Sequence, residues 1–164
     1  MSTLEWSPDL SLDLPVMDDT HREFVDLLAA VEQTSDAQLM TAWRELIAHT
    51  DTHFAREDRW MRDTRFATSN CHSMQHATVM QVIREGERLD RSDIIRQMAR
   101  ELALWFPEHA KNMDAALAQH LKTVGYDVDS GNVALPESLP ASVIQGCGSA
   151  ACTPSTEAPE TSSA

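Results

Sequence analysis

The 164-residue sequence has few positively charged residues and no long apolar run. It contains 13 Lys and Arg against 26 Asp and Glu, which gives a formal net charge of −13. A chain with this charge repels the phosphate backbone of nucleic acids and anionic membrane surfaces. No stretch approaches the roughly 18 consecutive apolar residues that a membrane-spanning helix needs. We therefore expect neither a nucleic-acid partner nor insertion into a membrane.

Targeting signals and a disulfide framework are also missing. The first 20 residues contain no Lys or Arg and no continuous apolar run, which argues against a secretory signal and favours a cytoplasmic location. The three cysteines, Cys71, Cys147 and Cys152, do not form the framework of a small secreted protein. Cys147 and Cys152 could bind a metal or form a small redox disulfide, but two incidental cysteines are the interpretation that their setting favours.

The composition of the chain changes near residue 130. Residues 130–164 contain no aromatic residue, no Lys and no Arg, but four of the seven prolines. Such a segment buries too little apolar surface to offset the entropy lost on ordering. We therefore predict a folded domain over residues 1–129 and a disordered tail over residues 130–164. The stretch VALPESLPASVI within this tail could dock weakly on the domain or on a partner.

Strand-like alternation is absent as well, and the apolar residues before the tail recur at helical spacing. In the first helical segment Asp18 is a plausible N-cap. In the last segment Pro107 predicts a kink or a break, because proline cannot donate a backbone hydrogen bond. We predict an all-α fold, an up-down-up-down four-helix bundle preceded by an N-terminal arm. The four predicted segments are residues 18–35, 36–63, 68–89 and 93–123.

Every predicted helix carries side chains that can bind a metal ion. They are His21 in the first, His53 and Glu57 in the second, His72 and His76 in the third, and His109 and Asp114 in the fourth. Two residues four apart on a helix differ by about 40° around its axis and about 6 Å along it, so both can point inward. A single histidine of this kind is usually a hydrogen-bonded core residue or an exposed one. Independent accidents would not place inward-pointing donors on all four helices, so the set as a whole predicts a metal site.

The donor count predicts two metal ions rather than one. His109 and Asp114 are five residues apart, about 140° around a regular α-helix, which is a poor arrangement for one ion. We therefore expect His109 to bind one metal and Asp114 to reach around as a bridge, as Glu57 can with its two oxygens. Three imidazoles and two bridges give one ion five ligands, and two imidazoles and two bridges give the other four. A shared oxygen then completes the first at six and leaves the second one position short, where a small ligand would bind.

Two further histidines stay outside this set. We expect His49 to be exposed, with a supporting role beside His53 as the alternative. We expect His120 to be a solvent-side residue near the end of its helix.

These residues resemble those of the hemerythrin family, and of single-domain bacterial hemerythrins in particular. The resemblance extends over about residues 4 to 120, from LEWSPDLSLDLPVMDDTHREFVDLL through HFAREDRWM and HSMQH to LWFPEHAKNMD. The chain departs from the family pattern at Asp13, where glycine is often found, and at Thr20, where glutamine is common. It also has Pro107 two residues before His109 and Ala110 after it. These departures leave every candidate ligand in place.

The resemblance implies a cofactor of two iron ions joined by an oxo or hydroxo bridge. His72, His76 and His109 resemble the ligands of the saturated iron, whereas His21 and His53 resemble those of the iron with the open position. Glu57 and Asp114 correspond to the bridging carboxylates. Phe54 and Trp105 would help line an apolar ligand pocket, and plain core packing is the alternative for both.

The function implied by the resemblance is reversible dioxygen binding by a carrier, storage or delivery protein that is not an enzyme. A protein that receives the oxygen is a possible partner. Five neutral histidines supply less negative charge than the ligands of carboxylate-rich diiron enzymes, which favours reversible binding over oxidation chemistry. Two alternatives stay open. The first is a diiron enzyme acting on peroxide or nitric oxide, and the second is an oxygen or redox sensor that signals through the tail.

Overall fold

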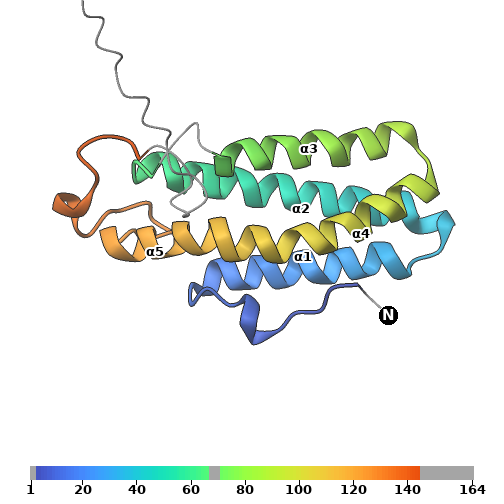
Figure 1. The fold of residues 1–164 in the computed structure, drawn as a ribbon, viewed down its shortest axis with the longest axis horizontal. Helices are drawn as coiled ribbons and strands as arrows, with labels where there is room; N and C mark the ends of the chain where they lie inside the picture. The colour runs from blue at the N-terminus through green and yellow to red at the C-terminus, as the bar shows by residue number, and fades with distance from the viewer. Residues whose placement is uncertain (1–2, 67–70, 145–164) are drawn as a thin grey trace, which may run out of the picture.

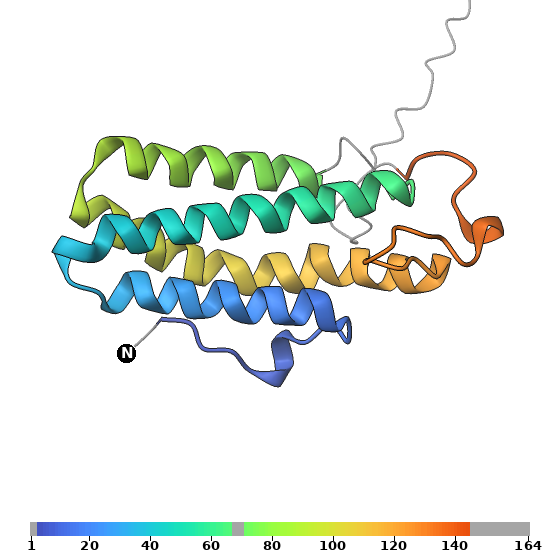
Figure 2. The ribbon, with the colours of Figure 1, turned by 180° about the vertical axis from the view of Figure 1, so that it is seen from behind.

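The structure, a computed structural model, describes residues 3–66 and 71–144. Four long helical stretches lie side by side, and each packs against its neighbours in a ring of four (Figures 1 and 2). The described residues contain no β-strand, so the predicted all-α four-helix bundle is confirmed. None of the helices in this part of the chain is long and apolar enough to cross a bilayer. The helices of the bundle are α1 (Pro15–Gln33), α2 (Asp36–Asp63), α3 (Cys71–Leu89), α4 (Ser92–His109), a π-helical turn (Ala110–Asp114) and α5 (Ala115–Val124), and two short 3-10 helices, Pro8–Leu10 and Pro136–Ser138, lie outside it.

The first helix begins three residues earlier than predicted. Pro15 occupies its first position, where the fixed φ of proline suits a helix and its missing N–H is not needed. Asp18 is therefore not the N-cap but lies in the first turn. Its carboxylate accepts hydrogen bonds from the Ser11 hydroxyl and the Leu12 amide, both at 2.7 Å. Asp18 thus ties the N-terminal arm to the start of α1.

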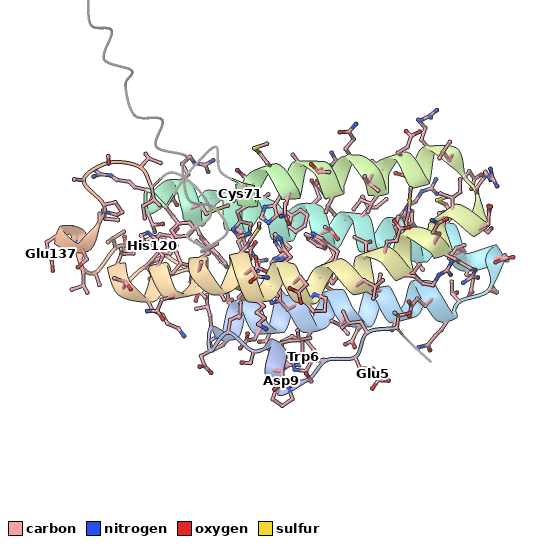
Figure 3. The ribbon with its side chains drawn as sticks, viewed as in Figure 1. Glu5, Trp6, Asp9, Cys71, His120 and Glu137 are labelled. Carbon is pink, nitrogen blue, oxygen red and sulfur yellow. The ribbon has the colours of Figure 1, made fainter. Side chains whose placement is uncertain are left out.

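The predicted N-terminal arm runs along the outside of the bundle (Figure 3). Leu4, Trp6 and Leu10 pack against the apolar core, and the Arg22 guanidinium lies 4.8 Å from the centre of the Trp6 ring. A cation over an indole ring adds to the apolar contact, so the arm is held by both kinds of interaction.

The interior has two apolar clusters with a buried polar layer between them. On α1, for example, Met17 belongs to one cluster and Phe24 to the other, and His21 lies between them in the sequence. On α2, Phe54 and Trp60 belong to different clusters in the same way. This arrangement places the polar layer in the middle of the bundle, between the two apolar clusters and away from both ends.

The fourth helical stretch stays helical through Pro107, where we predicted a kink or a break. Regular α-helix continues to His109 and then widens into the π-helical turn Ala110–Asp114 before α5 resumes. Proline has no N–H to donate to the carbonyl four residues earlier, and the changed hydrogen-bond pattern appears just after it rather than at it. The helix is therefore not broken at Pro107, and its turn is instead wider over Ala110–Asp114.

Residues 130–144, which the composition assigns to a disordered tail, instead form ordered contacts. Tyr126 and Val133 form an isolated antiparallel bridge, and the Ile144 amide donates to the Arg65 carbonyl at 3.0 Å. Val133, Leu139 and Ile144 pack against the apolar cluster that contains Met17 and Trp60. These three side chains cover apolar surface at the end of the bundle. The average composition of residues 130–164 does not reveal these few apolar contacts. Residues 145–164, including Cys147 and Cys152, lie outside the described residues.

The end of α5 provides a first prediction, because Gly125 there has a φ of +62°, in the left-handed region. Replacing Gly125 with Ala should lower the free energy of unfolding by about 1 kcal/mol or more. An added Cβ would also lie 3.0 Å from the Cβ of Ala134. Urea unfolding followed by circular dichroism measures the change. Gly125→Asn should lose less, because asparagine tolerates this conformation better, and equal stability of wild type and Gly125→Ala would contradict the prediction.

Candidate metal centre

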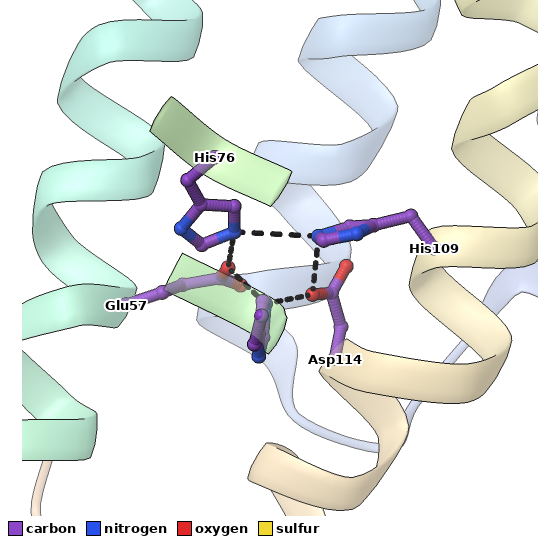
Figure 4. Close-up of side chains that lie close together, drawn as sticks. Glu57, His76, His109 and Asp114 are labelled. Carbon is purple, nitrogen blue, oxygen red and sulfur yellow. Dashed lines mark hydrogen bonds and ion pairs between the residues drawn. The ribbon is translucent and has the colours of Figure 1, made fainter. Parts of the chain in front are cut away.

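All seven side chains predicted to bind metal lie together in the buried polar layer, and each is at most 3% exposed. The four helical stretches each contribute, and Figure 4 shows Glu57, His76, His109 and Asp114 converging from three of them. The π-helical turn carries Asp114, while regular α-helix carries the other six.

The donor atoms form two overlapping groups, and within each group they lie within 4.8 Å of one another. We call them the five-donor group and the four-donor group. The carboxylates Glu57 and Asp114 belong to both. The five-donor group adds His72, His76 and His109, and the four-donor group adds His21 and His53.

Glu57 directs one oxygen at each group. Its Oε2 lies 3.5 Å from Nε2 of His72 and 3.3 Å from Nε2 of His76. Its Oε1 lies 3.7 Å from Nε2 of His53. The side chain therefore spans the two groups.

Asp114 divides its oxygens in the same way. Its Oδ1 lies 3.0 Å from Nε2 of His72 and 3.1 Å from Nε2 of His109. Its Oδ2 lies 3.2 Å from Nε2 of His21. The two carboxylates are thus equivalent in placement, one from α2 and one from the π-helical turn.

The π-helical turn explains how residues five apart can meet. In a regular α-helix, His109 and Asp114 would differ by about 140° around the axis. A π-helical turn is wider because its hydrogen bonds join residues five apart, so it brings these two side chains toward the same side of the helix. The separation that we predicted from a regular α-helix is therefore wrong. The sequence signal for the wider turn was the spacing of five itself, together with Pro107 upstream.

Many buried polar atoms of this layer make no hydrogen bond, although they lie close together. They include both ring nitrogens of His21 and His72, Nε2 of His53, and all four carboxylate oxygens of Glu57 and Asp114. Buried polar atoms without partners are rare in native proteins, and buried carboxylates without compensation are costly. Cations between the two carboxylates would satisfy these atoms. Imidazole and carboxylate together suit first-row transition metals, so the residues present fit a metal centre.

Hydrogen bonds on the outer side of two rings orient them. Asp58 Oδ1 lies 3.0 Å from Nδ1 of His76, and Gln75 Oε1 lies 3.1 Å from Nδ1 of His109. A carboxylate or amide oxygen here accepts a hydrogen bond from Nδ1–H, which leaves the Nε2 lone pair facing inward. The Nε2 atoms of His76 and His109 are 3.3 Å apart. Two lone pairs at that distance repel unless a cation or a proton lies near both.

The charges of the site are strongly coupled. Burial alone lowers the pKa of His72, but the adjoining carboxylates of Asp114 and Glu57 outweigh it and raise the pKa to about 10. Burial raises the pKa of Glu57, and the neighbouring histidines outweigh that effect and lower it. In the metal-free protein, protons on histidine therefore balance the two carboxylates, and metal binding must release them.

This balance predicts how the stability of the metal-free protein depends on pH. A histidine whose pKa is raised by folding stabilises the native state below the unfolded value of 6.5, and this contribution is lost as pH rises toward about 10. We expect the free energy of unfolding of the metal-free protein to fall by about 1 kcal/mol or more over this range. Urea titrations at a series of pH values measure it. The metal-loaded protein is the control, since its ligands carry no proton to lose, and a flat profile for the metal-free protein would contradict the prediction.

The two aromatic residues assigned to a ligand pocket lie mainly against the five-donor group. Phe54 stacks on His76 with ring centres 3.9 Å apart, and Trp105 stacks on His109 at 4.4 Å. Beside the four-donor group, Phe106 meets His21 edge-on with ring centres 5.1 Å apart, and sequence reasoning missed this residue. Its position three residues before His109, about one helical turn, was the available signal.

The remaining two histidines are less exposed than predicted. His49 Nε2 lies 3.1 Å from the Thr20 carbonyl oxygen, and its side chain is only 15% exposed. His120, labelled in Figure 3, lies with Nε2 3.0 Å from the Thr64 carbonyl oxygen, and its ring centre is 4.8 Å from that of Phe66. Neither belongs to the two donor groups, and both join neighbouring segments of the bundle instead.

Comparison of the sequence with known proteins shows which family the chain belongs to. The Hemerythrin HHE cation binding domain matches residues 12–121. A bacteriohemerythrin of Ralstonia nicotianae is 34% identical over 130 residues, which are 77% of this chain and 95% of that protein. A bacteriohemerythrin of Stenotrophomonas maltophilia is 29% identical over 133 residues, which are 74% of this chain and 84% of that protein. One of Pseudomonas paraeruginosa is 27% identical over 121 residues, which are 70% of this chain and 79% of that protein. No solved structure matches the chain. With the matched domain covering all seven donors and the helical bundle that carries them, the chain belongs to the hemerythrin family.

Proposed function

We propose that the protein binds dioxygen reversibly at a non-haem diiron centre and acts as an oxygen carrier, storage or delivery protein. His72, His76 and His109 would hold one iron, His21 and His53 the other, and Glu57 and Asp114 would bridge them. The observation that carries the proposal is the unequal division of donors, five on one side and four on the other, with each carboxylate shared. The four-donor side is one ligand short and can accept a small molecule.

Two irons held by these residues would supply the two electrons that reversible dioxygen binding needs. The protein residues determine whether that transfer stops and reverses. Five neutral imidazoles give the centre little negative charge compared with carboxylate-rich diiron sites, which disfavours higher oxidation states. Phe54 and Phe106, both buried, pack against His76 and His21 and limit the access of water from those two directions. These features support binding and release over turnover.

The test begins with iron-free protein that is loaded with Fe(II) under anaerobic conditions. Metal analysis should give two irons per chain, and the colourless protein should turn pink-violet in air and lose the colour under argon. At most one iron per chain, or no near-ultraviolet bands from a bridging oxygen after exposure to air, would contradict the proposal. Turnover of peroxide or nitric oxide far above that of free iron would instead support the enzymatic alternative.

A further inference from the structure

A polar cavity of about 360 Å³ opens between α1 and α2 beside the four-donor group. It is lined by Thr20, Glu23, Ala48, His49, Thr52, His53 and Arg56. A cavity of this size holds several water molecules or a small ion. His53 both lines the cavity and belongs to the four-donor group, and its Nε2 is buried, so this side chain lies between the cavity and the other donors of that group.

A larger cavity, of about 650 Å³, lies between α2 and α3 and includes His76. His76 belongs to the five-donor group, which needs no further ligand from outside the chain beyond a shared oxygen. The position for a small ligand is on the other side, where the donors number four. The cavity beside His53 is therefore the one that lies on the side where a ligand is needed.

Arg56 is the charged residue of interest in the cavity beside His53. It is half-buried, its Nη1 donates to the Thr20 hydroxyl at 3.2 Å, and no described carboxylate lies within ion-pair distance of it. The arginine of the other cavity, Arg84, is by contrast paired with Asp51 at 2.8 Å. A guanidinium has five N–H donors, so Arg56 keeps most of its donors for a ligand. The one carboxylate lining the cavity, Glu23, is 68% exposed and lies 3.7 Å from His49 instead.

We propose that this cavity is the route by which small inorganic anions reach the four-donor group, and that Arg56 attracts and positions them there. The inference rests on the proposed function, since it needs the open position on that side. A chain with a net charge of −13 repels anions in general, so a cation without a carboxylate partner at the mouth of the site has a large effect on their local concentration.

The experiment measures the rate of azide binding to oxidised, iron-loaded protein by stopped-flow absorbance. Arg56→Gln should slow binding about threefold to tenfold at low ionic strength, and the difference from wild type should shrink in 0.5 M salt. Arg56→Lys should recover most of the rate because it keeps the charge. Arg62→Gln is the matched control, since Arg62 is exposed on the same helix and does not line the cavity, and it should change the rate less than about twofold.

A second readout needs no iron. In the iron-free protein, azide should shift the NMR resonance of the Arg56 side-chain Nε–H and leave that of Arg84 unchanged. If the wild-type protein binds fewer than two irons, the proposed function is contradicted. The azide titration of iron-free protein would still test whether an anion binds beside Arg56. An unchanged azide rate in Arg56→Gln with both irons bound, a larger loss in Arg84→Gln, or no shift at Arg56 would overturn the inference.

Discussion

Replacing Asp114 with Asn is expected to reduce bound iron from two per chain to at most one. The substitution keeps the size of the side chain but removes the negative charge that faces both donor groups, with Oδ1 toward His72 and Oδ2 toward His21. Loss of a supporting contact around a metal ligand already costs 10- to 100-fold in affinity, so loss of a bridging ligand should cost more than about 100-fold. Metal analysis after anaerobic loading and gel filtration measures the effect.

Two further variants make this prediction specific. Glu57→Gln should behave like Asp114→Asn, because Glu57 also directs one oxygen to each group. Asp51→Asn removes a carboxylate from the same helix as Glu57, but Asp51 is exposed and pairs with Arg84, so both irons should be retained. Two irons in Asp114→Asn would show that this carboxylate is no bridge.

Removing the metal from the loaded protein should cause the largest loss of stability. A metal that binds only the folded chain stabilises it by about 4 kcal/mol when its free concentration is about 1,000 times its dissociation constant. In a protein of this length, that difference corresponds to a fall in the melting temperature of roughly 10 °C. The buried donor atoms without hydrogen-bond partners are the structural reason, because chelation removes the cations that would contact them and leaves only protons on histidine to balance the carboxylates. Calorimetry of loaded and chelated protein under argon measures the shift.

The matched control for metal removal is Asp114→Asn. If this variant holds little iron, chelator should leave its melting temperature nearly unchanged. A shift of similar size in both proteins would attribute the effect to the chelator and not to the metal.

Much of the architecture follows from patterns along the chain. Apolar residues at spacings of three and four predict the helices, and the donors recur on the same faces, as for His72 and His76. The candidate donors themselves follow from the sequence, because imidazole and carboxylate groups recur at inward-facing spacings on each predicted helix. Helix starts were less predictable. The pattern favours Asp18 as the cap, yet Pro15 begins the helix and Asp18 binds the arm instead.

Contacts between segments distant in sequence were not predictable. Composition alone assigned residues 130–144 to disorder, but Leu139 and Ile144 find apolar surface that exists only once the helices have packed. His49 was expected to be exposed, and its partner is a carbonyl on another helix, that of Thr20. Average composition does not report whether a matching surface lies nearby.

The sequence by itself determined that seven metal-competent side chains occur at inward-facing positions of four helices, because helical periodicity is a local property of the chain. Only the tertiary structure decided how they combine. The π-helical turn that aligns His109 with Asp114, the division of each carboxylate between two groups, and the cavity beside Arg56 all depend on the packing of one helix against another. Distances of about 3 Å between atoms from different helices are set by that packing, and no spacing along the chain encodes them.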